Sequence, residues 1–203
     1  MTTRERIIDT ALELFNASGT RAVTTNHIAA AMGISPGNLY YHFRNKEAII
    51  RAIFARMHEV GTREYLAINA ERGPGTAATM AETFVMIQRF NWRYRFFKRE
   101  LTALVMADPL LGEQFVASHR ANLAMVDAAL ERSITQGFLV PLAEPARRLL
   151  AEQVWMMTLF WLNYLEIGGE EVNDETLQRG IDHLQLLLGN YLTDAAKQAL
   201  ANS

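Results

Sequence analysis

The stretch TTNHIAAAMGISPGNLYYHFRNKE, residues 24–47, decides how this chain is interpreted. Thr24 or Thr25 can cap a short helix whose apolar pattern ends at Gly33. Ser35 and Pro36 then supply an N-cap and a first helical residue for a second helix. Glycine adopts a positive φ at little cost, so the turn between the helices is feasible. The stretch predicts a helix-turn-helix, which places its second helix in the major groove of DNA.

The second helix of this motif is expected to have a buried side and an exposed side. Leu39 and Phe43 are four residues apart and are expected to face inward. The residues left to face outward are Pro36, Gly37, Asn38, Tyr41 and His42. An asparagine pairs bidentately with adenine, and Asn26 offers a second amide at the start of the preceding helix. The phenols of Tyr40 and Tyr41 can donate hydrogen bonds to phosphate oxygens. The hydroxyl of Thr25 and the ammonium of Lys46 can do the same.

Three features of the same stretch have other interpretations. Tyr40 could be mostly core, with only its hydroxyl outside, and His42 could simply end the second helix. Residues 33–37 match the G-x-S-x-G nucleophile elbow of hydrolases. That motif needs a strand before its serine, and the pattern before Ser35 is helical, so we discount it.

Charge is distributed unevenly along the chain. The net charge is −2, but residues 1–56 hold seven Lys and Arg against four Asp and Glu, a balance of +3. The remaining residues hold 13 basic and 18 acidic side chains, a balance of −5. This asymmetry favours a DNA-facing head on a body that does not bind DNA.

Residues 4–50 resemble the DNA-binding domain of the TetR family of transcriptional regulators. The resemblance rests on about a dozen positions at fixed spacing: Thr24-Thr25, Ile28-Ala29, Gly33, Ser35, Gly37, Leu39-Tyr40, His42-Phe43 and Lys46-Glu47, with Ile7-Ile8, Ala11, Leu14-Phe15 and Gly19 upstream. It covers about a quarter of the chain, and the remainder is similar to the family only in its helical pattern.

The resemblance implies a homodimer that binds a near-palindromic DNA operator, usually as a repressor released by a small molecule. It assigns base or adjacent backbone contacts to Asn26, Pro36, Gly37, Asn38, Tyr40 and Tyr41, and phosphate contacts to Thr25, His42 and Lys46. Pro36 stands where some members have a polar base-reading side chain. We therefore expect apolar contact and DNA shape to contribute more of the specificity.

Helical periodicity continues through the rest of the chain, so the expected fold class is all-α. A first helix is expected to stop at Gly19, and a fourth to begin after Asn45. Longer helices are expected over 76–106, 109–136, 145–167 and 175–199, after a linker at 73–75. We expect a DNA-binding domain at 1–46, a connecting helix at 47–66, and a helical ligand-binding and dimerisation domain at 67–203.

The body is rich in aromatic residues and methionine but poor in charge. Most of these side chains must be core, yet a cavity between bundle helices remains feasible. We therefore expect an apolar or aromatic effector. The candidate ligand-binding residues are Phe84, Asn91, Trp92, Arg95, Phe96, Met125, Trp155, Phe160 and Asn163, with Tyr164 as a further polar group.

The last two expected helices carry more apolar surface than one core requires. One stripe consists of Leu177, Ile181, Leu184, Leu188 and Tyr191 or Leu192, and Leu149, Trp161, Leu162 and Leu165 enlarge it. We expect these helices to form a two-fold dimer interface. The alternative is that the stripes only close the core of the monomer.

Other classes of protein find less support. The chain has no cysteine, no secretory signal and no apolar run long enough for a bilayer, so a cytoplasmic protein without a membrane span is expected. The five histidines lack metal-binding spacing, and neither metal nor cofactor is expected. A helical enzyme or small-molecule-binding protein without a DNA-binding role is the alternative, but it leaves residues 24–47 unexplained.

Overall fold

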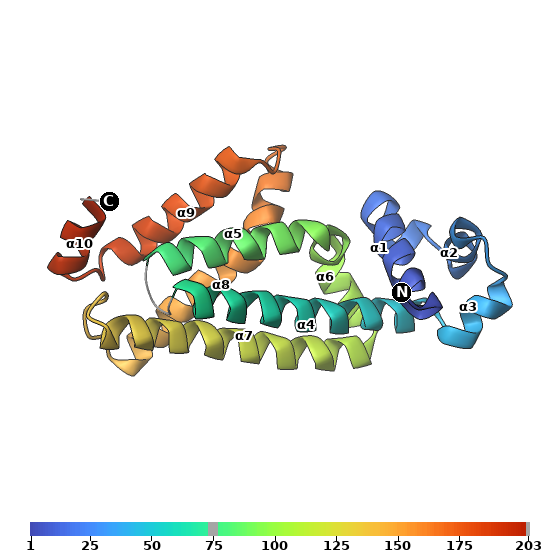
Figure 1. The fold of residues 1–203 in the computed structure, drawn as a ribbon, viewed down its shortest axis with the longest axis horizontal. Coiled ribbons are helices and arrows are strands. Elements are labelled where there is room, and N and C mark those ends of the chain that lie inside the picture. Colours follow the sequence, from blue (N-terminus) through green and yellow to red (C-terminus); the bar gives the residue numbers. More distant parts are fainter. Residues whose placement is uncertain (73–76, 202–203) are drawn as a thin grey trace. The chain divides into compact units, whose positions relative to one another are not determined.

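The structure is a computed structural model that describes residues 1–72 and 77–201, and its regular elements are helices (Figure 1). They are α1 (Thr3–Ala22), α2 (Thr25–Met32), α3 (Pro36–His42), α4 (Lys46–Arg72), α5 (Ala77–Arg93), α6 (Arg95–Ala107), α7 (Pro109–Thr135), α8 (Glu144–Ile167), α9 (Asp174–Gly189) and α10 (Asp194–Ala201). The expected all-α fold is confirmed. The expected linker at 73–75 lies outside the described residues.

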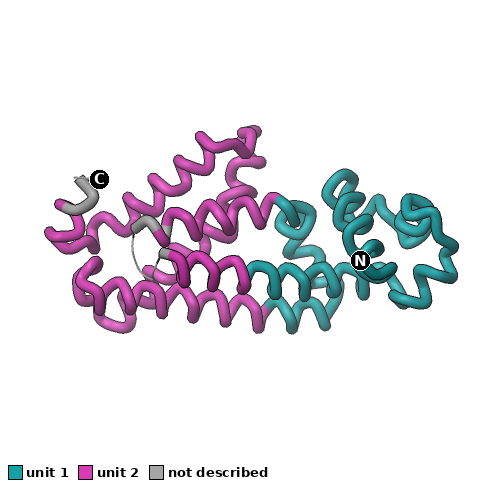
Figure 2. The backbone as a smooth tube through the Cα atoms, in the orientation of Figure 1, with its two compact units in different colours: residues 1–61, 93–115 teal, residues 62–92, 116–203 magenta. Residues whose placement is uncertain are grey.

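The chain divides into two compact units, coloured separately in Figure 2. Unit 1 comprises residues 1–61 and 93–115, and unit 2 comprises residues 62–92 and 116–203. The first unit therefore contains α6 as well as the N-terminal helices. Periodicity alone gives no sign of this grouping, because it reports an apolar face without naming the helix that covers it.

Local signals set the helix ends in unit 1. Gly19 has φ 75° and interrupts α1, which resumes through Ala22 instead of stopping at the glycine. Thr24 is the N-cap of α2, and its hydroxyl accepts a hydrogen bond from the amide of His27. Gly33 has φ 67° and ends α2, so the predicted turn is confirmed. Asn45 caps α4 by accepting a hydrogen bond from the amide of Ala48.

The core of unit 1 joins α1–α4 to α6. The buried set includes Ile7, Ile28, Leu39, Ile49 and Ile53, none of which is accessible to solvent. Phe96 packs on Phe15 with ring centroids 5.2 Å apart, and Phe97 stacks on Phe54 at the same separation. Burying each such side chain stabilises the unit by roughly 1.5–3 kcal/mol.

The prediction of a single helix over 76–106 is wrong, because the helix is interrupted at Tyr94, between α5 and α6. Asn16 of α1 provides partners for backbone groups freed there. Its Nδ2 donates to the carbonyl of Arg93 at 2.8 Å, and its Oδ1 accepts from the amide of Phe96 at 3.0 Å. These contacts with a distant residue offset the lost helical bonds.

The single helix expected over 175–199 is also wrong, because α9 ends at Gly189 and α10 begins at Asp194. The segment between them pairs with residues 138–140. The amide of Val140 donates to the carbonyl of Tyr191 at 2.8 Å, and the amide of Thr193 donates to the carbonyl of Phe138 at 3.1 Å. Tertiary backbone bonds thus replace helical ones.

Unit 2 is built around α5, α7, α8 and α9. One cluster consists of Phe84, Trp161, Leu162, Leu165, Ile181 and Leu184, and another consists of Leu130, Leu139, Leu150, Ala151 and Leu188. Gly180 lets α9 approach closely, because a Cβ there would lie 2.5 Å from the ring of Phe84. No helix in the described ranges has the length and apolar content needed to cross a bilayer.

Candidate nucleic-acid interface and ligand cavity

Two buried side chains and one cap fix α3 in place. Leu39 and Phe43 point into the core of unit 1, as predicted, and are almost inaccessible to solvent. Ser35 is the N-cap, and its hydroxyl accepts from the amide of Asn38 at 3.2 Å. Pro36 occupies the first helical position, where its missing N–H has no cost. The seven-residue helix is therefore held on one side and capped at its start.

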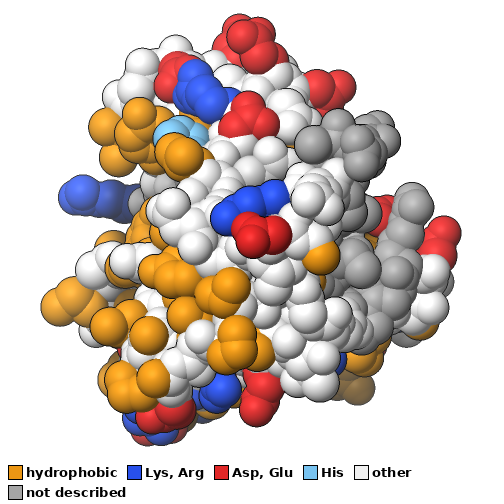
Figure 3. Space-filling view, turned by 90° about the vertical axis from the view of Figure 1, so that its left-hand side faces the viewer, with side chains coloured by type: hydrophobic (Ala, Val, Ile, Leu, Met, Phe, Trp, Pro, Cys, Tyr) orange, Lys and Arg blue, Asp and Glu red, His pale blue; other side chains and the backbone are white. Residues whose placement is uncertain are grey.

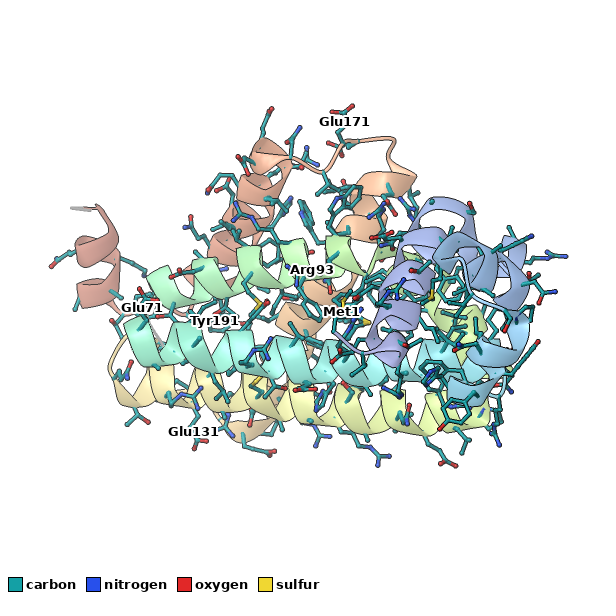
Figure 4. All side chains as sticks on the ribbon, turned by 45° about the vertical axis from the view of Figure 1, so that its right-hand side comes forward. Met1, Glu71, Arg93, Glu131, Glu171 and Tyr191 are labelled. Carbon is teal, nitrogen blue, oxygen red and sulfur yellow. The ribbon has the colours of Figure 1, made fainter. Side chains whose placement is uncertain are left out.

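The other side of α3 is open to solvent. Tyr41 is 86% exposed, and Pro36, Gly37 and Asn38 are exposed as well. Figure 4 shows side chains projecting outward from the α2–α3 end of unit 1. Asn26 is exposed at the start of α2. The outward-facing set expected from the sequence is thus present on the surface, where a duplex can reach its amides and phenol.

Tyr40 is not the mostly core residue that the sequence allowed as an alternative, because the residue is 49% exposed. Its hydroxyl lies 3.0 Å from the hydroxyl of Thr25, and this hydrogen bond links α3 to the start of α2. His42 is the last residue of α3 and is partly exposed, with its ring edge-on to that of Tyr41 at 5.1 Å.

Lys46 has a structural role that sequence reasoning missed. Its ammonium donates to the carbonyl of Thr20 at 2.6 Å and to that of Val23 at 3.1 Å, at the end of α1. A cation there suits the negative end of the helix dipole. An ammonium has three N–H groups, and these two bonds leave one. The phosphate contact expected of Lys46 stays a prediction.

Arg44 is a second residue that sequence reasoning missed. It lies between α3 and α4, is exposed, and has no hydrogen bond or ion pair with any other residue in the described ranges. Two other basic residues of the N-terminal segment are already neutralised, because Arg51 pairs with Asp108 and Arg56 pairs with Asp9. The signal for Arg44 was available: it is a basic residue directly after the helix expected to contact DNA.

Lys98 on α6 has an unusual environment in unit 1. Burial penalises its charged form and lowers the pKa from 10.5 to about 8. The unfolded chain binds this proton more tightly than the native state does, so the buried charge lowers the free energy of unfolding. The loss of stability is complete below about pH 8, and it fades as the pH rises toward 10.5.

We expect Lys98→Met to be more stable than the parent protein at about pH 7, and the gap to shrink at about pH 9.5. Urea unfolding at both pH values measures the difference in free energy of unfolding. Lys197→Met, at an exposed lysine, is the matched control and should show neither effect. A gap that stays constant with pH would contradict the assigned cause.

A cavity of about 100 Å³ lies within unit 2. Its lining is mostly apolar and consists of Tyr65, Asn69, Thr79, Thr83, Phe84, Ile87, Met125, Val126, Ala129, Leu130, Val154, Trp155, Thr158 and Leu184. Phe84, Met125 and Trp155 were among the expected ligand residues. Tyr65 and Asn69 were missed, although their spacing of four on α4 places them on one helix face.

The other six expected ligand residues do not line this cavity. Arg95 and Phe96 belong to unit 1, where the ring of Phe96 packs on Phe15, and neither of them lines this cavity. Asn91 is buried beside the cavity, with its amide 3.4 Å from the carbonyl of Thr158. The remaining three lie elsewhere on unit 2: Trp92 and Phe160 are exposed, Asn163 is partly buried, and none of them faces the cavity.

The apolar stripe expected to form a dimer interface is largely buried within unit 2. Leu177, Ile181, Leu184 and Leu188 of α9 are core residues, as are Trp161, Leu162 and Leu165 of α8. They close the core of the monomer, which was the alternative. Leu149 of the expected surface is exposed, and it shares an outer face of α8 with the exposed residues Met156, Phe160, Tyr164 and Ile167. A space-filling view shows hydrophobic side chains gathered on one part of the surface (Figure 3).

In the described part of the chain, no three His, Asp or Glu side chains come together to hold a metal ion. The capped, outward-facing second helix of the α2–α3 pair defines a helix-turn-helix DNA-binding protein. The family model described as "Bacterial regulatory proteins, tetR family" matches residues 7–53, and the one described as "Bacterial transcriptional repressor" matches residues 57–200. The chain belongs to the TetR family of bacterial transcriptional regulators.

Individual relatives agree with this assignment. The chain is 42% identical over 139 residues to the HTH-type transcriptional regulator UidR of Escherichia coli K12, which covers 68% of this chain and 70% of UidR. It is 36% identical to a TetR-family regulator from Marinobacter aquaeolei VT8, with a TM-score of 0.86 and coverage of 99% and 97%. SmeT of Stenotrophomonas maltophilia shares the fold at 24% identity, with a TM-score of 0.72 and coverage of 97% and 93%.

UidR and the Marinobacter protein are described as transcriptional regulators, and SmeT as the repressor of a multidrug efflux pump. Because the family model over residues 57–200 is described as a bacterial transcriptional repressor, the chain is a DNA-binding transcriptional repressor, and the interpretation as a helical enzyme is set aside.

Proposed function

We propose that the protein is a cytoplasmic homodimer that binds a near-palindromic operator and is released from it by a small apolar or aromatic ligand. In this proposal residues 1–46 contact DNA, residues 47–66 connect, and residues 67–203 bind the ligand and dimerise. The observation that carries it is the exposed side of α3, where Asn38 and Tyr41 stand on a helix held by Leu39 and Phe43.

The chemistry of the exposed side chains supports contacts of two kinds with DNA, to base edges and to phosphates. Asn38 and Asn26 suit base edges, and Tyr41 suits a thymine methyl group or a phosphate. Pro36, Gly37 and Tyr40 lie against the bases or the adjacent backbone. Thr25, His42 and Lys46 contact phosphates, and exposed Arg44 adds a contact that was not among those expected from the sequence.

The exposed stripe of α8 supports dimerisation. Its five apolar residues are spaced by seven, four, four and three positions, so they share one face of the helix. Leu186 on α9 adds a further exposed apolar side chain. A self-complementary contact between two copies removes this surface from water and pairs two heads about a two-fold axis. The homodimer thus still uses the last two long helices, but through the outer face of α8.

Two such heads must lie about 34–36 Å apart, or a multiple of that, to enter successive major grooves. Along the chain, α4 leads from Lys46 to the cavity residues Tyr65 and Asn69. A ligand that favours another tilt of α4 changes the spacing of the heads. Within unit 1, Glu100 of α6 accepts hydrogen bonds from the amide and the hydroxyl of Thr20 in α1. Movement of α6 is therefore transmitted to the first helix of the head.

We expect Glu100→Ala to lower the free energy of unfolding by about 1–3 kcal/mol, because it leaves the buried amide of Thr20 without a partner. The same change should reduce the factor by which an effector weakens operator binding. Urea unfolding and operator titrations with and without effector measure the two quantities. Glu113→Ala removes an exposed carboxylate from the same unit and is the control. Equal behaviour of the two variants would contradict the link between α6 and α1.

A gel-shift assay with DNA flanking the protein's own coding region tests the proposed function. We expect a specific complex that an unrelated fragment does not compete away. Effector and operator should weaken each other's binding by the same factor, because the coupling is reciprocal. A thermal-shift screen identifies effector candidates, and stabilisation only by highly charged metabolites would contradict the proposed ligand class. Ligand binding without any specific DNA complex would favour a helical ligand-binding protein instead.

A further inference from the structure

The guanidinium of Arg132 lies next to Tyr65, a polar residue that lines the cavity in unit 2. Tyr65 lines the cavity, and its hydroxyl accepts a hydrogen bond from Nη2 of Arg132 at 3.3 Å. Arg132 follows the cavity-lining residues Met125 and Ala129 of α7 by seven and three positions. This spacing puts the three residues on one helix face. Arg132 is not itself a lining residue, but its guanidinium is hydrogen-bonded directly to one, the hydroxyl of Tyr65.

Arg132 is incompletely satisfied there. Its Nε is buried and has no hydrogen-bond partner, and within the described ranges no carboxylate lies within ion-pair distance of its guanidinium. Two carboxylates are close to Arg132 along α7, but another arginine binds both. Arg147 donates to both oxygens of Asp127, at 2.8 and 3.1 Å, and lies 3.7 Å from Glu131. A partly buried cation without a counterion is costly, and a bound anion would offset that cost.

We propose that this cavity takes a small organic carboxylate, with its apolar body among Phe84, Leu130 and Trp155 and its carboxylate at Arg132 and Tyr65. A guanidinium offers parallel N–H groups that match a carboxylate, and the phenol supplies one more donor. The inference rests on the proposed ligand-binding role of the same cavity and narrows it from apolar molecules in general to apolar acids.

The volume limits the size of the body. The cavity measures about 100 Å³, and an apolar cavity of about 150 Å³ is known to hold one benzene ring. This cavity is smaller than that one, so a single aromatic ring or a medium-length alkyl chain enters only after side chains such as Met125 move aside. Phenylpropionate, hexanoate and octanoate are suitable probes, each compared with its own primary amide, which keeps the shape and lacks the charge.

Calorimetric titration of the full-length protein without DNA tests the inference. At neutral pH we expect at least one acid to bind about 10-fold to 100-fold more tightly than its amide. Arg132→Gln should abolish the preference by weakening acid binding far more than amide binding, Tyr65→Phe should reduce the preference several-fold, and Arg132→Lys should retain part of it. Arg148→Gln removes an exposed arginine of α8 and should change nothing.

Three results would overturn the inference: equal or tighter binding of the amides, a preference for acids that survives Arg132→Gln, or absence of binding by every acid in the panel. Its failure is separable from failure of the proposed function. Release of the operator by neutral aromatic molecules alone would keep the regulator and discard the acid. Acid binding that depends on Arg132 but leaves operator affinity unchanged would keep the carboxylate site and discard the proposed release from the operator by this ligand.

Discussion

Replacing Asn38 and Tyr41 together by alanine is expected to weaken operator binding about 30-fold or more. A well-placed base contact contributes about 1–3 kcal/mol, two such contacts are lost, and each 1.4 kcal/mol is about tenfold in affinity. Both side chains are exposed, so the free energy of unfolding should change by no more than about 0.5 kcal/mol per site. Fluorescence anisotropy with labelled operator measures the affinity, and thermal unfolding monitors the fold.

Two further variants sharpen this prediction. Tyr41→Phe keeps the ring and removes the phenol, so it separates contact with a thymine methyl group from hydrogen bonding to phosphate. Gln114→Ala truncates an exposed amide on α7 and should bind operator like the parent protein. Unchanged affinity of the double variant for the operator would show that another surface of the protein binds DNA.

Placing a carboxylate in the middle of the exposed α8 stripe, by Phe160→Glu, is expected to dissociate the dimer and lower operator affinity by at least about 100-fold. The variant buries an unpaired charge at the contact between two copies, which strongly disfavours association. A lone head reaches only one half-site, so it loses the contacts of the second. Sedimentation equilibrium gives the oligomeric state, and anisotropy gives the affinity.

The control for this experiment is Leu66→Glu, which introduces the same charge at a similarly exposed apolar residue of α4, 60% against 50% exposed. It should leave both quantities unchanged. Ile167→Asp, at the end of the α8 stripe, provides a second test should Phe160→Glu fold poorly. A Phe160→Glu protein that folds, stays dimeric and binds operator normally would exclude the α8 face as the interface.

The helix-turn-helix could be predicted because its determinants are local. Thr24, Ser35 and Asn45 each cap a helix within three residues of themselves, and Gly33 supplies the positive φ that the turn requires. The inward positions Leu39 and Phe43 follow from helical spacing alone. The family resemblance lies in the same segment, so the helix-turn-helix itself could be predicted, whereas the continuation of α1 past Gly19 and the bonds of Lys46 to the end of α1 could not.

The features of the fold and of the cavity that could not be predicted depend on contacts between residues far apart in the sequence. The break at Tyr94 is satisfied by Asn16, nearly eighty positions earlier, and the sequence pattern across the break is continuous. Periodicity identified apolar faces on α8 and α9, but it could not say which face is covered by the monomer's own core. Arg132 and Tyr65 become neighbours only when α7 packs against α4, so the cationic group beside the cavity has no signature in the sequence.

The central claim is that α3 lies against the operator. Because the chain has no cysteine, Asn38→Cys creates a single site that can carry an aryl-azide photo-crosslinker. At protein concentrations that saturate the operator, illumination should join α3 to bases in each half-site, whereas the same label at Leu66→Cys should give no DNA adduct. Absence of operator adducts from position 38, or equal yields from both positions, would contradict the account.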